Sequence, residues 1–141
     1  MHRVLIPVDG SDGALRAAAH LIGLVYHRAP PEVHVLNVQQ PIMSGDVGPT
    51  VTAEMVTRTR RAAGEAILRR AQALLDRSGV PNEASVLFGI PADTIVRYVD
   101  EHDIDGIVMG TRGMSALKNL LLGSVATKVV GLAEVPVTLV K

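Results

Sequence analysis

Glycine and hydroxyl residues recur at a fixed spacing near the carboxyl end of the chain. Gly110 and Gly113 follow the apolar run 107–109, and Gly123 and Ser124 come after nine further residues. Glycine lets backbone N–H groups approach an anion closely, and a helix N-terminus adds unpaired N–H groups and partial positive charge. The spacing therefore predicts a phosphate site. The alternative is that Gly110 and Gly113 only form a turn.

The composition indicates a single α/β domain that covers residues 1–141. A chain of 141 residues is close to the usual domain size of about 100–150, and its 48% hydrophobic content is ample for one core. Only 2% of the residues are aromatic, so Val, Leu, Ile and Ala must fill that core, as in buried parallel sheets. Because 14 basic residues balance 14 acidic ones, we expect no nucleic-acid partner.

Several classes of site and location are disfavoured. The absence of cysteine excludes disulfides, thiolate metal sites and thiol nucleophiles. The five histidines show no H-E-x-x-H or comparable spacing, so we expect no transition-metal site and mostly solvent-facing imidazoles. No uncharged apolar stretch approaches the roughly 18–20 residues of a membrane span, and the first apolar run is too short for a signal peptide. A soluble cytoplasmic protein without a membrane partner is expected.

Short apolar runs alternate with helical patterns along the whole chain. Strands are predicted at residues 3–8, 33–38, 84–88, 107–109 and 135–140. Helices are predicted between them, and the apolar positions expected to face the sheet are Leu15, Ala18, Ala19 and Ile22; Ala63, Ile67, Ala71, Leu74 and Leu75; and Ala92, Ile95, Val96 and Val99. This alternation predicts an open parallel sheet with helices on both faces. The connection 39–50 is unusually long, as in lids or disordered loops.

An open parallel sheet binds ligands beyond the carboxyl ends of its strands. Residues 7–11 follow the first predicted strand, 38–40 follow the second, 88–91 the third and 110–113 the fourth. We therefore expect these loops to surround the site. Lys118 does not belong to a G-x-x-x-x-G-K-[ST] motif, so it is expected on the surface.

The spacing Gly110-x2-Gly113-x9-Gly123-Ser124 resembles the nucleotide-binding signature of the universal stress protein family, in its ATP-binding branch. The resemblance extends over the chain: it includes the opening 4–11, the junction Gly89-x-Pro91, the approach 105–110 and the ending 135–137. It implies a single-domain, Rossmann-like five-stranded parallel sheet of order 3-2-1-4-5. It also implies that a homodimer often forms through the last strand.

The resemblance also implies roles for individual residues in holding ATP. It places Asp9 against the ribose or adenine, where a carboxylate can accept hydrogen bonds from hydroxyl groups. The alternative for Asp9 is to cap the first helix beside Ser11. Arg112 lies inside the glycine turn and either pairs with phosphate or reaches solvent. The complete set of expected nucleotide-binding residues, with Mg²⁺ able to accompany the phosphates, is Pro7, Val8, Asp9, Val38, Met109, Gly110, Arg112, Gly113, Gly123, Ser124 and Val125.

The expected function is that of an ATP-binding regulatory or stress-response module. Asp9 is the one carboxylate that the sequence places at the crevice, which favours binding over catalysis. A slow Mg-dependent ATPase or phosphoryl-transfer enzyme is the alternative, and a structural dimer with a vestigial site is a second one. The apolar run Val135–Val140 would lie at a sheet edge, where pairing with a second copy prevents aggregation. We therefore expect a homodimer through this run.

Overall fold

A five-stranded parallel sheet forms the centre of the computed structural model, which describes residues 1–26, 28–113 and 122–141. The strands are β1 (Arg3–Pro7), β2 (Glu32–Gln39), β3 (Asn82–Phe88), β4 (Gly106–Gly110) and β5 (Val137–Val140), in the order β3-β2-β1-β4-β5. All neighbouring strands are parallel. The sheet order that the family resemblance implies is confirmed.

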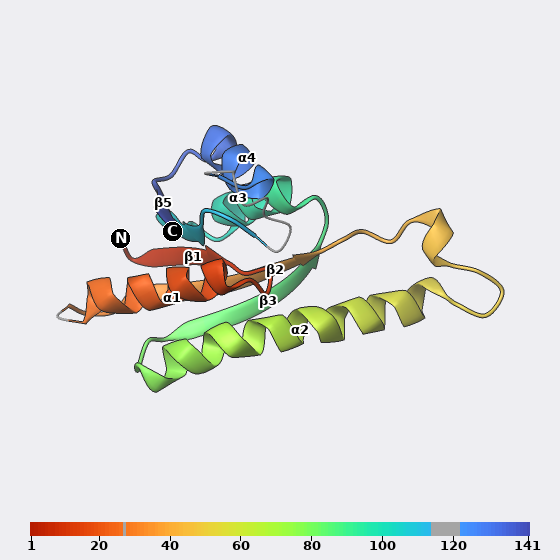
Figure 1. Ribbon diagram of the computed structural model, residues 1–141, viewed down its shortest axis with the longest axis horizontal. Helices are drawn as coiled ribbons and strands as arrows, with labels where there is room; N and C mark the ends of the chain where they lie inside the picture. Colours follow the sequence, from red (N-terminus) through yellow and green to blue (C-terminus); the bar gives the residue numbers. More distant parts are fainter. Residues whose placement is uncertain (27, 114–121) are drawn as a thin grey trace.

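Helices cover both faces of the sheet, as the alternating pattern predicted. They are α1 (Asp12–Val25), α2 (Ala53–Arg77), α3 (Pro91–Glu101) and α4 (Ser124–Leu132). Figure 1 shows α1 and α2 on one face and α3 and α4 on the other. Each pair packs on its own side of the β-branched strands, which gives two separate hydrophobic clusters. No helix in the described residues is both long and apolar enough to cross a membrane.

The predicted sheet-facing positions of α1 and α2 are partly wrong. Helix α1 buries Ala14, Ala17, Ala18 and Leu21, whereas Ala19 is exposed. Helix α2 buries Gly64, Leu68, Ala71 and Leu75, whereas Ala63 is exposed. Apolar residues occur around much of α1, so the spacing i, i+3, i+4, i+7 fits two adjacent stripes equally well. Alanine and glycine on the chosen stripes let the helices approach the sheet closely. On α3, Ala92, Ile95 and Val99 are buried as predicted.

The long connection between β2 and α2 has a defined conformation and extends beyond the sheet (Figure 1). It contains a 3-10 turn, η1 (Ser44–Asp46). Arg60 on α2 holds it through an ion pair of 3.0 Å to Asp46 and donates to the carbonyls of Gln40 and Pro41. The N–H of Met43 and the guanidinium of Arg60 lower the pKa of Asp46. A cavity lies at the carboxyl ends of the strands, and no residue of this connection after Gln39 is among the described residues that line it.

His34 is buried and is an exception to the expectation that most histidines face solvent. It is 3% exposed, and its Nδ1 lies 2.8 Å from Tyr98 Oη and 3.0 Å from Glu83 Oε1. The ring of His102 stacks on Tyr98 at 3.7 Å. Strand β2 is covered on both faces, so a polar residue within it has no solvent to face. Exposed histidines are His2 and His20, while His27 and Lys118 lie outside the described residues.

Candidate functional site

A cavity of about 400 Å³ opens where β1, β2 and β4 end and where α3 and α4 begin. This volume lies within the range of about 300–1,000 Å³ that is usual for small-molecule sites. All eleven residues singled out in the sequence line it: Pro7, Val8, Asp9, Val38, Met109, Gly110, Arg112, Gly113, Gly123, Ser124 and Val125. Residues from four segments that are distant in the sequence therefore lie around one cavity, at the carboxyl ends of the strands as expected.

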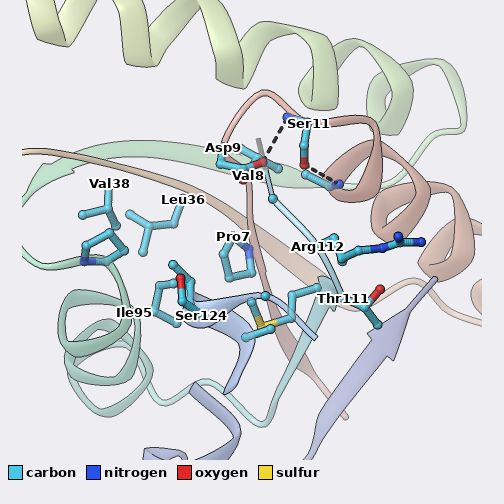
Figure 2. Close-up of a pocket in the computed structure, with 18 residues that line it drawn as sticks. Pro7, Val8, Asp9, Ser11, Leu36, Val38, Ile95, Thr111, Arg112 and Ser124 are labelled. Carbon is cyan, nitrogen blue, oxygen red and sulfur yellow. Dashed lines mark hydrogen bonds between the residues drawn. The ribbon is translucent and has the colours of Figure 1, made fainter. Parts of the chain in front are cut away.

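The lining of the cavity combines apolar side chains with backbone. Leu36 and Val38 from β2 and Ile95 from α3 are apolar and lie on one side of the view in Figure 2. The glycine loop after β4 and the start of α4 also line the cavity. An apolar surface can accept a flat ring, while backbone N–H groups can bind an anion. The two kinds of lining suit different parts of one ligand.

Asp9 lies in the turn between β1 and α1. Its Oδ1 accepts a hydrogen bond of 3.0 Å from the N–H of Ser11, and Ser11 Oγ in turn accepts one of 3.3 Å from the N–H of Ala14 (Figure 2). Ser11 is therefore the N-cap of α1. Gly10 between them has φ +89°, which favours glycine. The capping role considered for Asp9 is performed by Ser11, while Asp9 stabilises the turn before it.

Gly110 and Gly113 lack space for a side chain for different structural reasons. A Cβ atom at Gly110 would lie 2.8 Å from the carbonyl carbon of Gly13, so Gly110 lets the start of α1 pack against β4. The fold therefore requires Gly110 whether or not a ligand binds. Gly113 instead approaches the carboxylate of Asp9, with no room for a side chain between them. This contact joins the loops that follow β1 and β4.

Helix α4 begins at the cavity with Gly123 as its N-cap. The N–H of Gly123 donates to the carbonyl of Thr111 at 2.6 Å, which fixes the start of α4 against the glycine loop. A glycine N-cap offers no side chain to bond the N–H groups of Val125 and Ala126, the second and third residues of the helix. The N–H groups of the first turn and the helix dipole can attract a negatively charged group.

Arg112 is among the lining residues of the cavity. The residue is exposed, and Figure 2 shows its side chain extending away from Leu36 and Val38. Pairing of Arg112 with a phosphate stays a prediction.

Seven further residues line the cavity. Ser11, Pro91 and Thr111 lie in loops that were expected to surround the site, whereas Ala14, Leu36, Ile95 and Ala126 were not expected there. Ile95 follows Pro91 at i, i+4 at the start of a helix, a signal that could have identified it.

The comparisons with known proteins agree with this architecture. Residues 1–141 match the model of the Universal stress protein family. The chain belongs to this family. A universal stress protein from Thermus aquaticus is 36% identical over 144 residues, which cover 98% of this chain and 97% of the relative.

Two solved universal stress protein structures contain nucleotides. One, described as a complex with cAMP, has a TM-score of 0.70 and 27% identity, and the match covers 99% of this chain and 97% of that one. The other, from Archaeoglobus fulgidus in complex with dAMP, has a TM-score of 0.65 and 26% identity, and the match covers 100% and 98%. Both ligands named for these universal stress proteins are adenine nucleotides.

Proposed function

We propose that this universal stress protein binds an adenine nucleotide in the cavity and acts as a nucleotide-dependent regulatory module in the stress response. The main supporting observation is that apolar side chains, a carboxylate and a helix N-terminus without a side-chain cap all line one cavity. These three environments suit adenine, ribose and phosphate, respectively. The cAMP and dAMP complexes of the two relatives support the same ligand class.

Each part of the nucleotide has a proposed set of contacts. The adenine ring lies between Val38 and Ile95, and the backbone at the end of β2 reads its polar edge. The ribose hydroxyls donate to the carboxylate of Asp9. The phosphates accept from backbone N–H groups of Gly113, Ser124 and Val125, at the positive end of α4. Pro7, Val8, Met109 and Gly110 form the floor and wall between these groups.

ATP is the nucleotide that we expect at physiological concentrations, with Mg²⁺ bound through its phosphates. Within the described residues, no group of three or more histidine, aspartate or glutamate side chains could hold a metal ion. A magnesium ion would therefore enter with the nucleotide rather than occupy a protein site in advance. Mg²⁺ commonly binds through substrate phosphates in this way. Asp9 is the one carboxylate among the described lining residues, which supports binding rather than turnover.

Calorimetry on protein freed of copurifying nucleotide tests the proposed function. ATP, AMP and adenosine are titrated separately, because only the first two can use the N-terminus of α4. We expect ATP and AMP to bind more tightly than adenosine, and Gly123→Val to reduce this advantage. Nucleotide at about 100 times its Kd should also stabilise the fold by about 2.7 kcal/mol. The absence of any binding at millimolar ATP would refute the proposal.

We also propose that two copies pair through Val135–Val140. Strand β5 is at the edge of the sheet because it pairs only with β4, and Leu139 on it is 37% exposed. An apolar edge strand exposes backbone donors and acceptors to other chains. Pairing of two β5 strands about a two-fold axis covers both the backbone and the apolar side chains.

A further inference from the structure

Asn37 is a buried polar side chain in the middle of β2. It is 2% exposed and is not among the described residues that line the cavity. Its Nδ2 donates to the carbonyl of Val8 at 2.9 Å, and its Oδ1 accepts from Gln39 Nε2 at 2.7 Å. A carbonyl can only accept, so the nitrogen of Asn37 must face Val8. Both ends of the amide are therefore bonded in one orientation.

This bond extends the sheet beyond the end of β1. The strand ends at Pro7, and the N–H of Val8 still donates to the carbonyl of Leu36 at 2.8 Å. Asn37 then binds the carbonyl of Val8, so that both polar backbone groups of Val8 are attached to β2. Asp9 is the next residue, and its direction depends on how the preceding peptide is held.

Helix α2 lies directly behind the same segment. A Cβ atom at Gly64 would lie 2.8 Å from Asn37 Oδ1, which shows how closely the helix covers this amide. Ile67, one turn further, lies against Gly10, where a Cβ atom would be 3.4 Å from its Cγ1. Helix α2 thus contacts both the residue that holds Val8 and the residue that follows Asp9.

We propose that Asn37 is the positioning residue that orients Asp9 toward the ribose of a bound nucleotide, and that α2 acts on the nucleotide site through Asn37. This inference rests on the proposed function and adds a determinant of ribose selectivity outside the cavity. It also predicts that movement of α2 changes nucleotide binding, because a shift of this helix at Gly64 displaces the Asn37 amide that holds the Asp9 turn.

The test measures the preference of the protein for ribose over deoxyribose. Kd values for AMP and for its 2′-deoxy and 3′-deoxy forms are measured for wild type, Asn37→Leu and Asp9→Asn. A hydrogen bond to a charged carboxylate corresponds to at least about a tenfold preference for AMP over one of the deoxy forms in wild type. We expect both variants to reduce this preference to within about twofold. A merely structural role of Asn37 would weaken all three ligands alike and preserve the ratio.

A matched pair of glycine substitutions tests the link to α2. Gly64→Ala places a methyl group against both Asn37 and Val86, whereas Gly23→Ala adds one to α1 with no atom within 4 Å. We expect Gly64→Ala to reduce the ribose preference and Gly23→Ala to preserve it. If Asn37→Leu does not fold, Asn37→Asp keeps the size of the side chain but cannot donate from its carboxylate to the carbonyl of Val8, and should reduce the preference in the same direction.

The outcomes separate this inference from the proposed function. Failure of wild-type protein to bind any of the nucleotides would overturn the proposed function itself. Binding without a ribose preference would overturn the role given to Asp9, and with it this inference. Binding with a ribose preference that survives Asn37→Leu, or Asn37→Asp where the former does not fold, would overturn the inference alone. A preference that survives Gly64→Ala would overturn the link to α2.

Discussion

Gly113 lies against the carboxylate of Asp9, so closely that a Cβ atom at residue 113 would overlap with Oδ2. The two residues follow β4 and β1, which are adjacent in the sheet although they are distant in the sequence. The absence of a side chain at residue 113 therefore lets the Asp9 carboxylate occupy the space between the two loops. This contact connects the proposed ribose contact with the proposed phosphate loop.

Gly113→Ala should weaken nucleotide binding without unfolding the protein. The added methyl group would displace the Asp9 carboxylate, which we expect to reduce ATP affinity at least about tenfold, or about 1.4 kcal/mol. Gly113 is exposed and has no positive φ, so the free energy of unfolding should change by less than about 1 kcal/mol. Calorimetry and thermal denaturation measure the two quantities. Gly131→Ala, with no atom within 4 Å of the new methyl group, is the control; equal ATP affinity in both variants would contradict the expectation.

Gly110→Ala, unlike Gly113→Ala, should lower the free energy of unfolding of the protein. Its methyl group would lie 2.8 Å from the backbone of Gly13, which cannot move without shifting the start of α1. Overpacking of this kind costs about 1–3 kcal/mol. Urea unfolding in the absence of nucleotide measures the loss. Gly23→Ala should instead stabilise the protein by up to about 1 kcal/mol, because it improves helix propensity in open space. Unchanged stability of Gly110→Ala would show that α1 can move.

Leu139→Asp should produce a monomer if β5 is the dimer interface. A charge at this half-exposed position on the edge strand would be buried and unpaired between two copies. Multi-angle light scattering over a range of concentrations measures the mass. Leu24→Asp changes an apolar side chain at the end of α1 that is 57% exposed, and should leave the mass unaltered. A dimer that persists in Leu139→Asp would exclude this interface.

Acidification should destabilise the junction between the start of β1 and the start of β4. Hydrogen bonds from the backbone N–H groups of Arg3 and His2 lower the pKa of Asp105 below its ordinary value. A carboxyl group with a lowered folded-state pKa contributes stability above its unfolded pKa of about 3.9 and loses it as the pH falls through the folded pKa. Asp105→Asn should therefore be less stable than wild type at pH 7 and lose less stability between pH 5 and pH 2. Urea midpoints across this range measure both slopes; parallel slopes would refute the role of Asp105.

The buried contacts that orient the site could not be read from the sequence. His34 and Asn37 are buried polar residues in a strand whose other buried residues are Val and Leu, yet their partners Tyr98, Glu83 and Val8 belong to other elements. Their separation of three residues shows only that these two side chains point to opposite faces of the sheet. Whether each one finds a donor, an acceptor or solvent depends on which element packs there.

The sequence by itself determined the element order, the parallel sheet and eleven of the residues that line the cavity. Those features depend on local properties: β-branched runs form strands, glycine and proline end elements, and parallel strands place their carboxyl ends at one edge. The tertiary structure decided which stripe of α1 and α2 is buried, why Gly110 and Gly113 are needed, and how Asn37 holds Val8. These depend on distances between segments far apart in the chain, and such distances exist only after the sheet and helices have packed.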